Sequence, residues 1–172
     1  MDDRIVTIFG TGRAKAGDLT FELAYELGRE LARSWFTIAN GGYGGTMLAG
    51  AKGASEAGGE VIGVTCSAWK SKANEFVSRE IVTASLNERL GKLVELGRAY
   101  IVLPGGTGTL LELAMVWELK NKGFLGGEKP IILLGEFWKP LVDVVASDDF
   151  ESSRSVEQAD GVEQAVQLII DY

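Results

Sequence analysis

The chain has 172 residues, of which 46% are hydrophobic and 24% are charged. This composition allows one domain with a sizeable core and excludes disordered and collagen-like chains. With 17 basic and 24 acidic residues the formal net charge is -7, so we expect no nucleic acid and no membrane surface among the partners. The sequence contains no histidine, which removes His-based triads, His-ligated zinc and His acid–base catalysis.

Cysteine content and the start of the chain indicate the compartment. Cys66 is the single cysteine, so neither an intramolecular disulfide nor a multi-cysteine metal site can form. The segment 1–4 is acidic where a secretory signal would be basic, and no apolar run reaches the ~18 residues of a membrane span. We therefore expect a cytoplasmic protein, with no metal and no cofactor in its site.

Short β-rich runs alternate with helical patterns along the chain. The expected strands are 5–9, 35–39, 61–64, 80–83, 100–103 and 130–134. The expected helices are 19–33, 45–57, 85–97, 110–117, 138–145 and 161–170, with an acidic turn at 148–149. This alternation predicts an α/β fold, a single doubly wound Rossmann-like domain over residues 1–172 with a mainly parallel sheet of six or seven strands flanked by helices.

Two helices carry local signals of their own. In the first, Leu19, Leu23, Leu27 and Leu31 recur at fourfold spacing, which predicts one buried face. In the third, the segment 85–88 reads Ser-Leu-Asn-Glu, which is typical of a capping box at a helix start.

The first glycine turn, Gly10-Thr11-Gly12, follows the first expected strand. Lys15 stands where a dinucleotide fingerprint has its third glycine, and the second strand is followed by Asn40 rather than an acid, so NAD binding is poorly supported. A direct ligand contact and a plain tight turn are equally good interpretations of this loop.

The second glycine turn joins a strand to a helix rich in small residues. It contains Gly41, Gly42, Gly44 and Gly45, more glycines than a bare strand-to-helix turn needs. Glycine lets backbone N–H groups approach an anion closely. This favours a phosphate or ribose contact by Gly41, Gly42 and Gly45 over a purely conformational role.

The third motif spans Pro104 to Glu112 and precedes a long apolar helix. Successive N–H donors at a positive helix end predict a phosphate cradle, made by Gly105, Gly106, Thr107, Gly108 and Thr109. Glu112 then lies at the rim of an apolar pocket, where desolvation raises a carboxyl pKa and the helix dipole lowers it. The same residues also fit a capping box of Thr109 with Glu112, so a catalytic and a capping role both stay open.

Arg89 lies at the border of the buried stripe of its helix, about 60° from the stripe's centre. On this pattern alone, a solvent-facing arginine is the more common outcome. Cys66, directly after the third strand, is best interpreted as a small core residue.

The motif from Pro104 to Glu112 reads PGGTGTLLE and resembles the PGGxGTxxE hallmark of the LOG ("lonely guy") family, long labelled "possible lysine decarboxylase". The glycine turn with Met47 resembles the family's GGGxxGxMG, and Ile62-Gly63-Val64 resembles its IGV strand. Arg89 stands fifteen residues before Pro104, as the family's arginine does. The chain is also similar to the shorter bacterial branch grouped with molybdenum-cofactor carrier proteins.

The resemblance implies hydrolysis of the N-glycosidic bond of nucleoside 5′-monophosphates, of the AMP or cytokinin ribotide type, to free base and ribose 5-phosphate. It implies that Arg89 and Glu112 are the essential groups and that the protein is a homodimer with its site near the subunit contact. The apolar helix after Glu112 also favours a homodimer. The alternative is a carrier that binds a nucleotide or the molybdenum cofactor without turnover. A pyridoxal-dependent decarboxylase fits poorly, because no cofactor-lysine setting is evident.

Overall fold

One sheet of seven strands forms the centre of the computed structural model, which describes residues 4–172. The strand order is β4-β3-β2-β1-β5-β6-β7, and every neighbouring pair is parallel. The strands are β1 Ile5–Phe9, β2 Thr37–Asn40, β3 Val61–Cys66, β4 Arg79–Thr83, β5 Ala99–Val102, β6 Ile131–Leu134 and β7 Glu157–Ala159.

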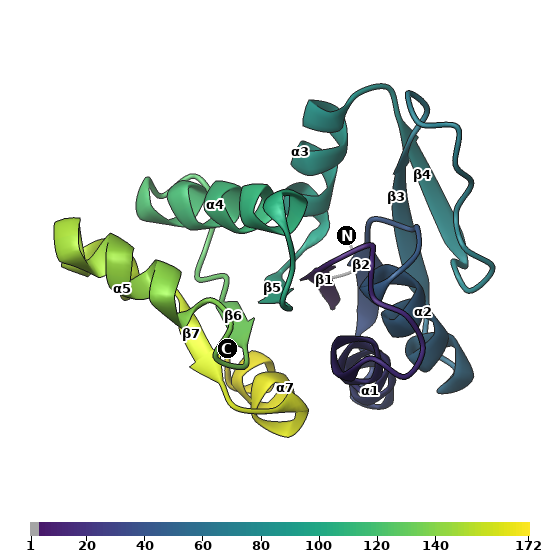
Figure 1. Ribbon diagram of the computed structural model, residues 1–172, viewed down its shortest axis with the longest axis horizontal. Helices are drawn as coiled ribbons and strands as arrows, with labels where there is room; N and C mark the ends of the chain where they lie inside the picture. The colour runs from purple at the N-terminus through teal and green to yellow at the C-terminus, as the bar shows by residue number, and fades with distance from the viewer. Residues whose placement is uncertain (1–3) are drawn as a thin grey trace.

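Helices cover both faces of this sheet (Figure 1). They are α1 Leu19–Arg33, α2 Thr46–Glu56, α3 Leu86–Leu96, α4 Thr107–Asn121, α5 Lys139–Asp148, α6 Phe150–Ser153 and α7 Val162–Asp171. On one face α1, α2 and α7 pack in a core that includes Leu27, Ala51 and Ile169. On the other face α3 and α4 bury Leu93 and Val116. The predicted doubly wound α/β fold with a parallel sheet of six or seven strands is therefore confirmed.

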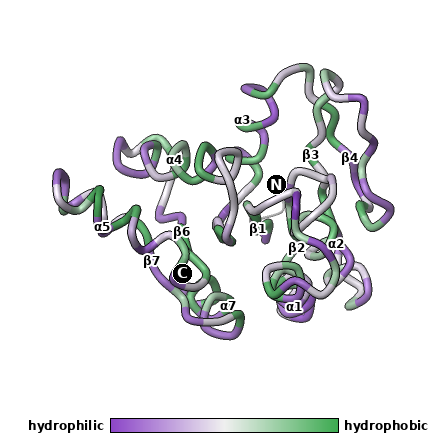
Figure 2. The backbone as a smooth tube through the Cα atoms, in the orientation of Figure 1, coloured by the Kyte–Doolittle hydropathy of each residue, from purple (hydrophilic) through white to green (hydrophobic). Residues whose placement is uncertain are grey.

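Coverage of both faces explains the composition of the strands. β1, β2, β3, β5 and β6 are buried along their whole length, as near-continuous apolar strands of a covered parallel sheet should be. The edge strand β4 instead exposes Arg79 and Glu80, and Figure 2 shows hydrophilic colour at that end of it. Charged side chains on an edge strand oppose pairing with another chain.

The N-terminal half departs from the sequence expectations in two places. The strand expected from residue 35 begins at Thr37, because Trp35 adopts a φ of 64° and ends the α1 turn with its side chain 82% exposed. The buried stripe of α1 runs through Phe21 and Ala24 rather than Leu19, which is 89% exposed. At 100° per residue Leu19 lies about 200° from Phe21.

The C-terminal part contains more structure than the sequence indicated. The acidic turn expected at 148–149 marks the start of α6, where the Asp149 carboxylate accepts the N–H of Ser152 at 3.0 Å. The short strand β7 was not expected, and it pairs with β6 at the end of the sheet. Three residues with mixed polarity, Glu157 to Ala159, are too few to give a recognisable strand pattern.

The order of the strands fixes where a ligand would bind. The chain runs outward from β1 through β2 and β3 to β4 and then returns to β5 on the other side of β1. Strand order therefore reverses between β1 and β5. In open α/β sheets the crevice at the carboxyl ends of the strands at such a reversal is the usual ligand site, and the loops after β1 and β5 carry the first and third glycine motifs.

The expectation that the chain has no secretory signal concerns segment 1–4, of which residues 1–3 lie outside the described residues. Among residues 4–172, the helices are either too short or too polar for one of them to traverse a bilayer.

Candidate functional site

A cavity of about 630 Å³ lies at the carboxyl ends of the central strands. This volume is in the usual range of small-molecule sites. Its walls come from the loops after β1, β2, β3 and β5 and from α2, α3 and α4. The lining residues are Gly10, Thr11, Gly12, Arg13, Tyr43, Met47, Trp69, Arg89, Gly106, Thr107, Gly108, Thr109 and Glu112.

Arg89 enters this cavity from the first turn of α3, and backbone carbonyls hold its guanidinium. The helix begins at Leu86 after the N-cap Ser85, whose side chain accepts the N–H of Glu88 at 3.2 Å, as the capping-box pattern predicted. Arg89 Nε donates to the carbonyl oxygen of Val64 at 2.8 Å, and Nη2 donates to that of Gly41 at 3.1 Å. The side chain is 8% exposed, so the arginine is a fixed group of the site rather than a solvent-facing one.

Aromatic rings and a carboxylate complete the surroundings of this cation. The guanidinium carbon of Arg89 lies 5.5 Å from the ring centre of Tyr43 and 5.1 Å from that of Trp69, within reach of a cation–π attraction. Burial lowers the pKa of Arg89, and the carboxylate of Glu112 opposes this change. The rings and the carboxylate thus compensate a charge that has lost most of its water.

The glycines after β2 allow the site to close around Arg89. A Cβ on Gly41 would overlap Nη2 of Arg89 and come within 2.6 Å of the Met47 sulfur. Gly45 has a φ of 66°, and a Cβ there would overlap the carbonyl oxygen of Thr11. Glycine is therefore needed at both positions for close packing of this turn against its neighbours.

Glu112 extends from the second turn of α4. The helix begins at Thr107 with Gly106 as its N-cap, three residues before the start at Leu110 that a Thr109 cap requires. The capping-box interpretation of Thr109 with Glu112 is therefore wrong. The Glu112 side chain is 13% exposed, and its Oε1 lies 3.9 Å from Nη1 of Arg89.

The environment of Glu112 sets its protonation. Within residues 4–172 no hydrogen-bond donor reaches its carboxylate, and the nearest cation is Arg89. Burial raises the pKa of Glu112 to about 7, although Arg89 acts in the opposite direction. A carboxyl group with this pKa exchanges protons close to neutral pH, and its unused acceptor oxygens line the cavity.

The start of α4, on the same helix as Glu112, also lines the cavity and is suited to an anion. The first N–H groups of a helix have no partners within it and carry partial positive charge. Gly106, Thr107 and Gly108 are exposed there, whereas Thr109 is buried. Arg13 adds a cation from the loop after β1, and none of the described carboxylates lies within 4.0 Å of its guanidinium.

The residues predicted for the site fall into two groups. Those that line the cavity are Gly10, Thr11, Gly12, Gly106, Thr107, Gly108, Thr109, Arg89 and Glu112. Those beside it are Gly41, Gly42, Gly45 and Gly105. Gly42 uses its N–H to donate to Oδ1 of Asn40 at 2.8 Å, and a Cβ on Gly105 would overlap the side chain of Thr109. These four glycines therefore pack behind the residues that line the cavity and do not line it themselves.

Four further lining residues were not among the predicted site residues. Tyr43 and Met47 belong to the second glycine turn, and Arg13 follows the first one directly, so their neighbourhood could have indicated them. Trp69 lies in the irregular segment 67–78 between β3 and β4, which has no motif or periodicity. No sequence signal pointed to it.

Comparisons with known proteins place this geometry in a family. The model of the SLOG cluster4 family matches residues 3–166. The chain belongs to the SLOG cluster4 family. It is also 32% identical over 146 residues to the cytokinin riboside 5′-monophosphate phosphoribohydrolase of Rhodococcoides fascians, covering 81% of this chain and 73% of that protein. Over 117 residues it is 37% identical to the protein of the same name from Mycobacterium tuberculosis, covering 66% and 61% respectively.

Among solved structures, this SLOG cluster4 chain is similar to the molybdenum cofactor binding protein of Rippkaea orientalis. The TM-score is 0.82 at 28% identity, and the match covers 99% of this chain and 98% of that one. The LOG-family resemblance predicted from the PGGTGTLLE motif is thereby confirmed. The proteins similar to this chain thus include two named as phosphoribohydrolases and one named for binding a cofactor.

Proposed function

We propose that the protein hydrolyses the N-glycosidic bond of nucleoside 5′-monophosphates, of the AMP or cytokinin ribotide type, to free base and ribose 5-phosphate. The observation that carries this proposal is the pair of Glu112 and Arg89 in a cavity that the N-terminus of α4 also lines. The helix N-terminus can bind the phosphate of a nucleotide while Glu112 and Arg89 contact the bond between its sugar and its base. Phosphoribohydrolases among the relatives support the same reaction class.

In this proposal the 5′-phosphate is held at the start of α4. The N–H groups of Gly106, Thr107, Gly108 and Thr109 provide donors, and Arg13 provides a counter-charge. Binding the phosphate fixes the sugar, which lowers the entropic cost of reaching the transition state. A nucleoside without the phosphate should therefore react poorly.

Glu112 carries the chemical step in its ionised form. Cleavage of a glycosidic bond passes through an oxocarbenium-like state, so a carboxylate beside C1′ stabilises the positive charge that develops there. The C1′–N bond breaks with its electron pair leaving on the base, and water forms the new C1′–O bond. Glu112 accepts the water's proton and later releases it to solvent, while the departing base takes up one proton from solvent to leave neutral. Arg89 polarises the departing base or the phosphate.

A carrier function is the second candidate, because the match to the Rippkaea orientalis protein extends over nearly the full length of both chains. In a carrier, the same N–H groups and Arg13 would hold the phosphate of a nucleotide or of the molybdenum cofactor, and Glu112 would bind a ligand group without turnover. It predicts saturable binding and no release of free base.

We also propose a homodimer that forms over the outer side of α4. Leu110 and Leu111 are exposed there, with side chains 37% and 45% accessible, and Ala114 continues the same apolar surface. An exposed apolar strip next to a site is typical of a subunit contact.

Chromatography of reactions with AMP, GMP, CMP, UMP and a cytokinin ribotide tests the proposal. We expect base and ribose 5-phosphate in equal amounts from at least one of these nucleotides, and only traces from adenosine. Loss of release in both Arg89→Ala and Glu112→Gln, with folds verified, would support the assigned roles. Release from adenosine as fast as from AMP would contradict the phosphate-positioning argument.

A further inference from the structure

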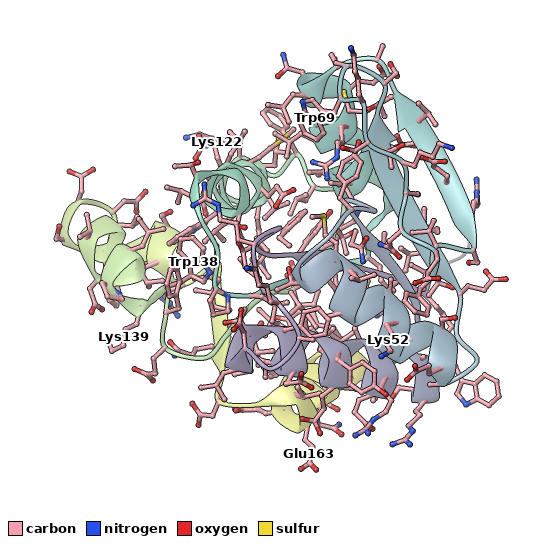
Figure 3. The ribbon with its side chains drawn as sticks, turned by 45° about the vertical axis from the view of Figure 1, so that its right-hand side comes forward. Lys52, Trp69, Lys122, Trp138, Lys139 and Glu163 are labelled. Atoms are coloured by element: carbon pink, nitrogen blue, oxygen red, sulfur yellow. The ribbon has the colours of Figure 1, made fainter. Side chains whose placement is uncertain are left out.

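The segment 67–78 between β3 and β4 is unusual for a parallel sheet. Parallel neighbours are normally joined through a helix, but this connection has none. Long connections without secondary structure in a compact fold are usually functional. This one passes over the carboxyl end of β3 and brings Trp69 to the wall of the cavity, as Figure 3 shows near α3 and β3.

Hydrogen bonds hold this segment to the second glycine turn. The backbone N–H of Asn74 donates to the Gly42 carbonyl oxygen at 2.8 Å, and its side-chain amide donates to the carbonyl oxygens of Gly42 and Tyr43 at 3.0 and 2.9 Å. At the other end, the N–H of Trp69 donates to the carbonyl oxygen of Cys66 at 3.1 Å. The segment is thus anchored on both sides of the tryptophan.

The indole of Trp69 packs against Tyr43 and Arg89. The ring centres of Tyr43 and Trp69 are 5.6 Å apart with the planes tilted by 56°, and the Arg89 guanidinium lies against both rings. Tyr43 is fixed in turn, because its hydroxyl accepts the N–H of Cys66 at 2.8 Å. Trp69 nevertheless remains 42% exposed and lines the cavity.

We infer that Trp69 is the stacking platform for the base of the ligand and makes the site select a fused, two-ring heterocycle over a single-ring pyrimidine. This inference rests on the proposed function for the position of the sugar and phosphate. An anchored aromatic side chain that lines a cavity offers a planar ligand a large contact at little entropic cost. A purine overlaps an indole over a larger area than a pyrimidine does.

The test measures binding in a Glu112→Gln background, which prevents turnover. The probes are AMP, CMP and ribose 5-phosphate, and the changes are Trp69→Ala, Trp69→Phe and, as a matched control, Trp35→Ala. Trp35 is 82% exposed at the end of α1 and does not line this cavity. Binding is followed by titration calorimetry and by quenching of tryptophan fluorescence.

We expect Trp69→Ala to weaken AMP binding by roughly 10- to 100-fold, the effect of removing one aromatic–base stack. CMP binding should weaken less and ribose 5-phosphate binding should not change. Trp69→Phe should recover most of the AMP affinity but lose the AMP-dependent quenching, while Trp35→Ala retains both. A role in folding alone would weaken all three ligands equally, and that result would overturn the inference.

Failure of the inference and failure of the proposed function give different results. If the protein with intact Glu112 releases base but Trp69→Ala keeps the wild-type ratio of AMP to CMP affinity, only the platform is wrong. If no base is released but AMP binding still depends on Trp69, the hydrolase proposal fails and the platform stands. Unchanged AMP affinity in Trp69→Ala overturns the inference in either case.

Discussion

Gly41→Ala is the substitution that most directly probes how the site is built. The new Cβ would overlap Nη2 of Arg89 and lie within 2.6 Å of the Met47 sulfur and 3.0 Å of the guanidinium carbon. Arg89 cannot move away freely, because its Nε donates a hydrogen bond to the Val64 carbonyl oxygen. The rings of Tyr43 and Trp69 also lie against its guanidinium. The guanidinium must therefore shift by roughly an ångström or give up a hydrogen bond.

The expected cost follows from these contacts. A hydrogen bond made by a charged group contributes about 1.5–3 kcal/mol, and misplacing a group of the site by an ångström costs about 100-fold in rate. We expect kcat/KM for base release from AMP to fall by about 100-fold and the free energy of unfolding to fall by about 1–3 kcal/mol. Backbone strain adds nothing, because Gly41 is not among the glycines with a positive φ.

Gly91→Ala is the matched control for this experiment. Gly91 lies in α3, two residues after Arg89, and a Cβ there meets no atom within 4 Å. Alanine is favoured over glycine in a helix by about 0.5–1 kcal/mol, so this variant should be active and at least as stable as the parent. Chromatographic assay of adenine and thermal unfolding of both variants give the comparison. A folded Gly41→Ala protein with unchanged kcat/KM would refute the argument that Arg89 must be held in this position.

Four further predictions concern Glu112, Arg13 and the subunit contact. Because the active form of Glu112 is the carboxylate, kcat should rise with pH through about 7, and kcat falling over that range would contradict it. The pKa of Glu112 in the folded protein lies above its ordinary value of 4.5. Ionisation of this carboxyl therefore lowers the free energy of unfolding by on the order of 3 kcal/mol as the pH rises to about 7. Glu112→Gln should accordingly raise the Tm at pH 8 but not near pH 4. Arg13→Ala should weaken AMP and ribose 5-phosphate about 10-fold or more by calorimetry and leave adenosine unchanged; equal weakening of adenosine would refute its phosphate role. In sedimentation at micromolar concentration the mass should be near twice 18.4 kDa and return to one chain in Ala114→Arg, whereas a wild-type monomer would contradict the dimer.

Much of the fold could be predicted because the sequence repeats one physical pattern. Most buried strands are apolar runs that end close to a glycine or a small polar residue, and most of them are followed by a helical pattern. A doubly wound sheet covered on both faces follows from that alternation. Two short elements that bury little surface could not be predicted from this pattern. β7 has only three residues, and α6 depends on a single cap at Asp149.

The site was only partly predictable because its groups meet through tertiary structure. Arg89 and Glu112 come from different helices and are 23 positions apart in the sequence, and the resemblance to a family motif was what linked them. The capping-box pattern predicted a helix cap at Thr109 that is wrong, since Gly106 is the extended N-cap residue and the helix begins directly after it. Trp69 was missed because nothing local distinguishes an exposed loop tryptophan from one that is anchored against an arginine.

The central claim is that the cavity turns over a nucleotide with Glu112 as the chemical group. The most direct measurement pairs calorimetric binding of AMP with quantification of adenine and ribose 5-phosphate, using wild-type and Glu112→Gln protein under the same conditions. We predict equal amounts of the two products from the wild type, and saturable binding of AMP without products in the variant. AMP binding by both proteins with no product from either would contradict hydrolysis and identify the protein as a carrier.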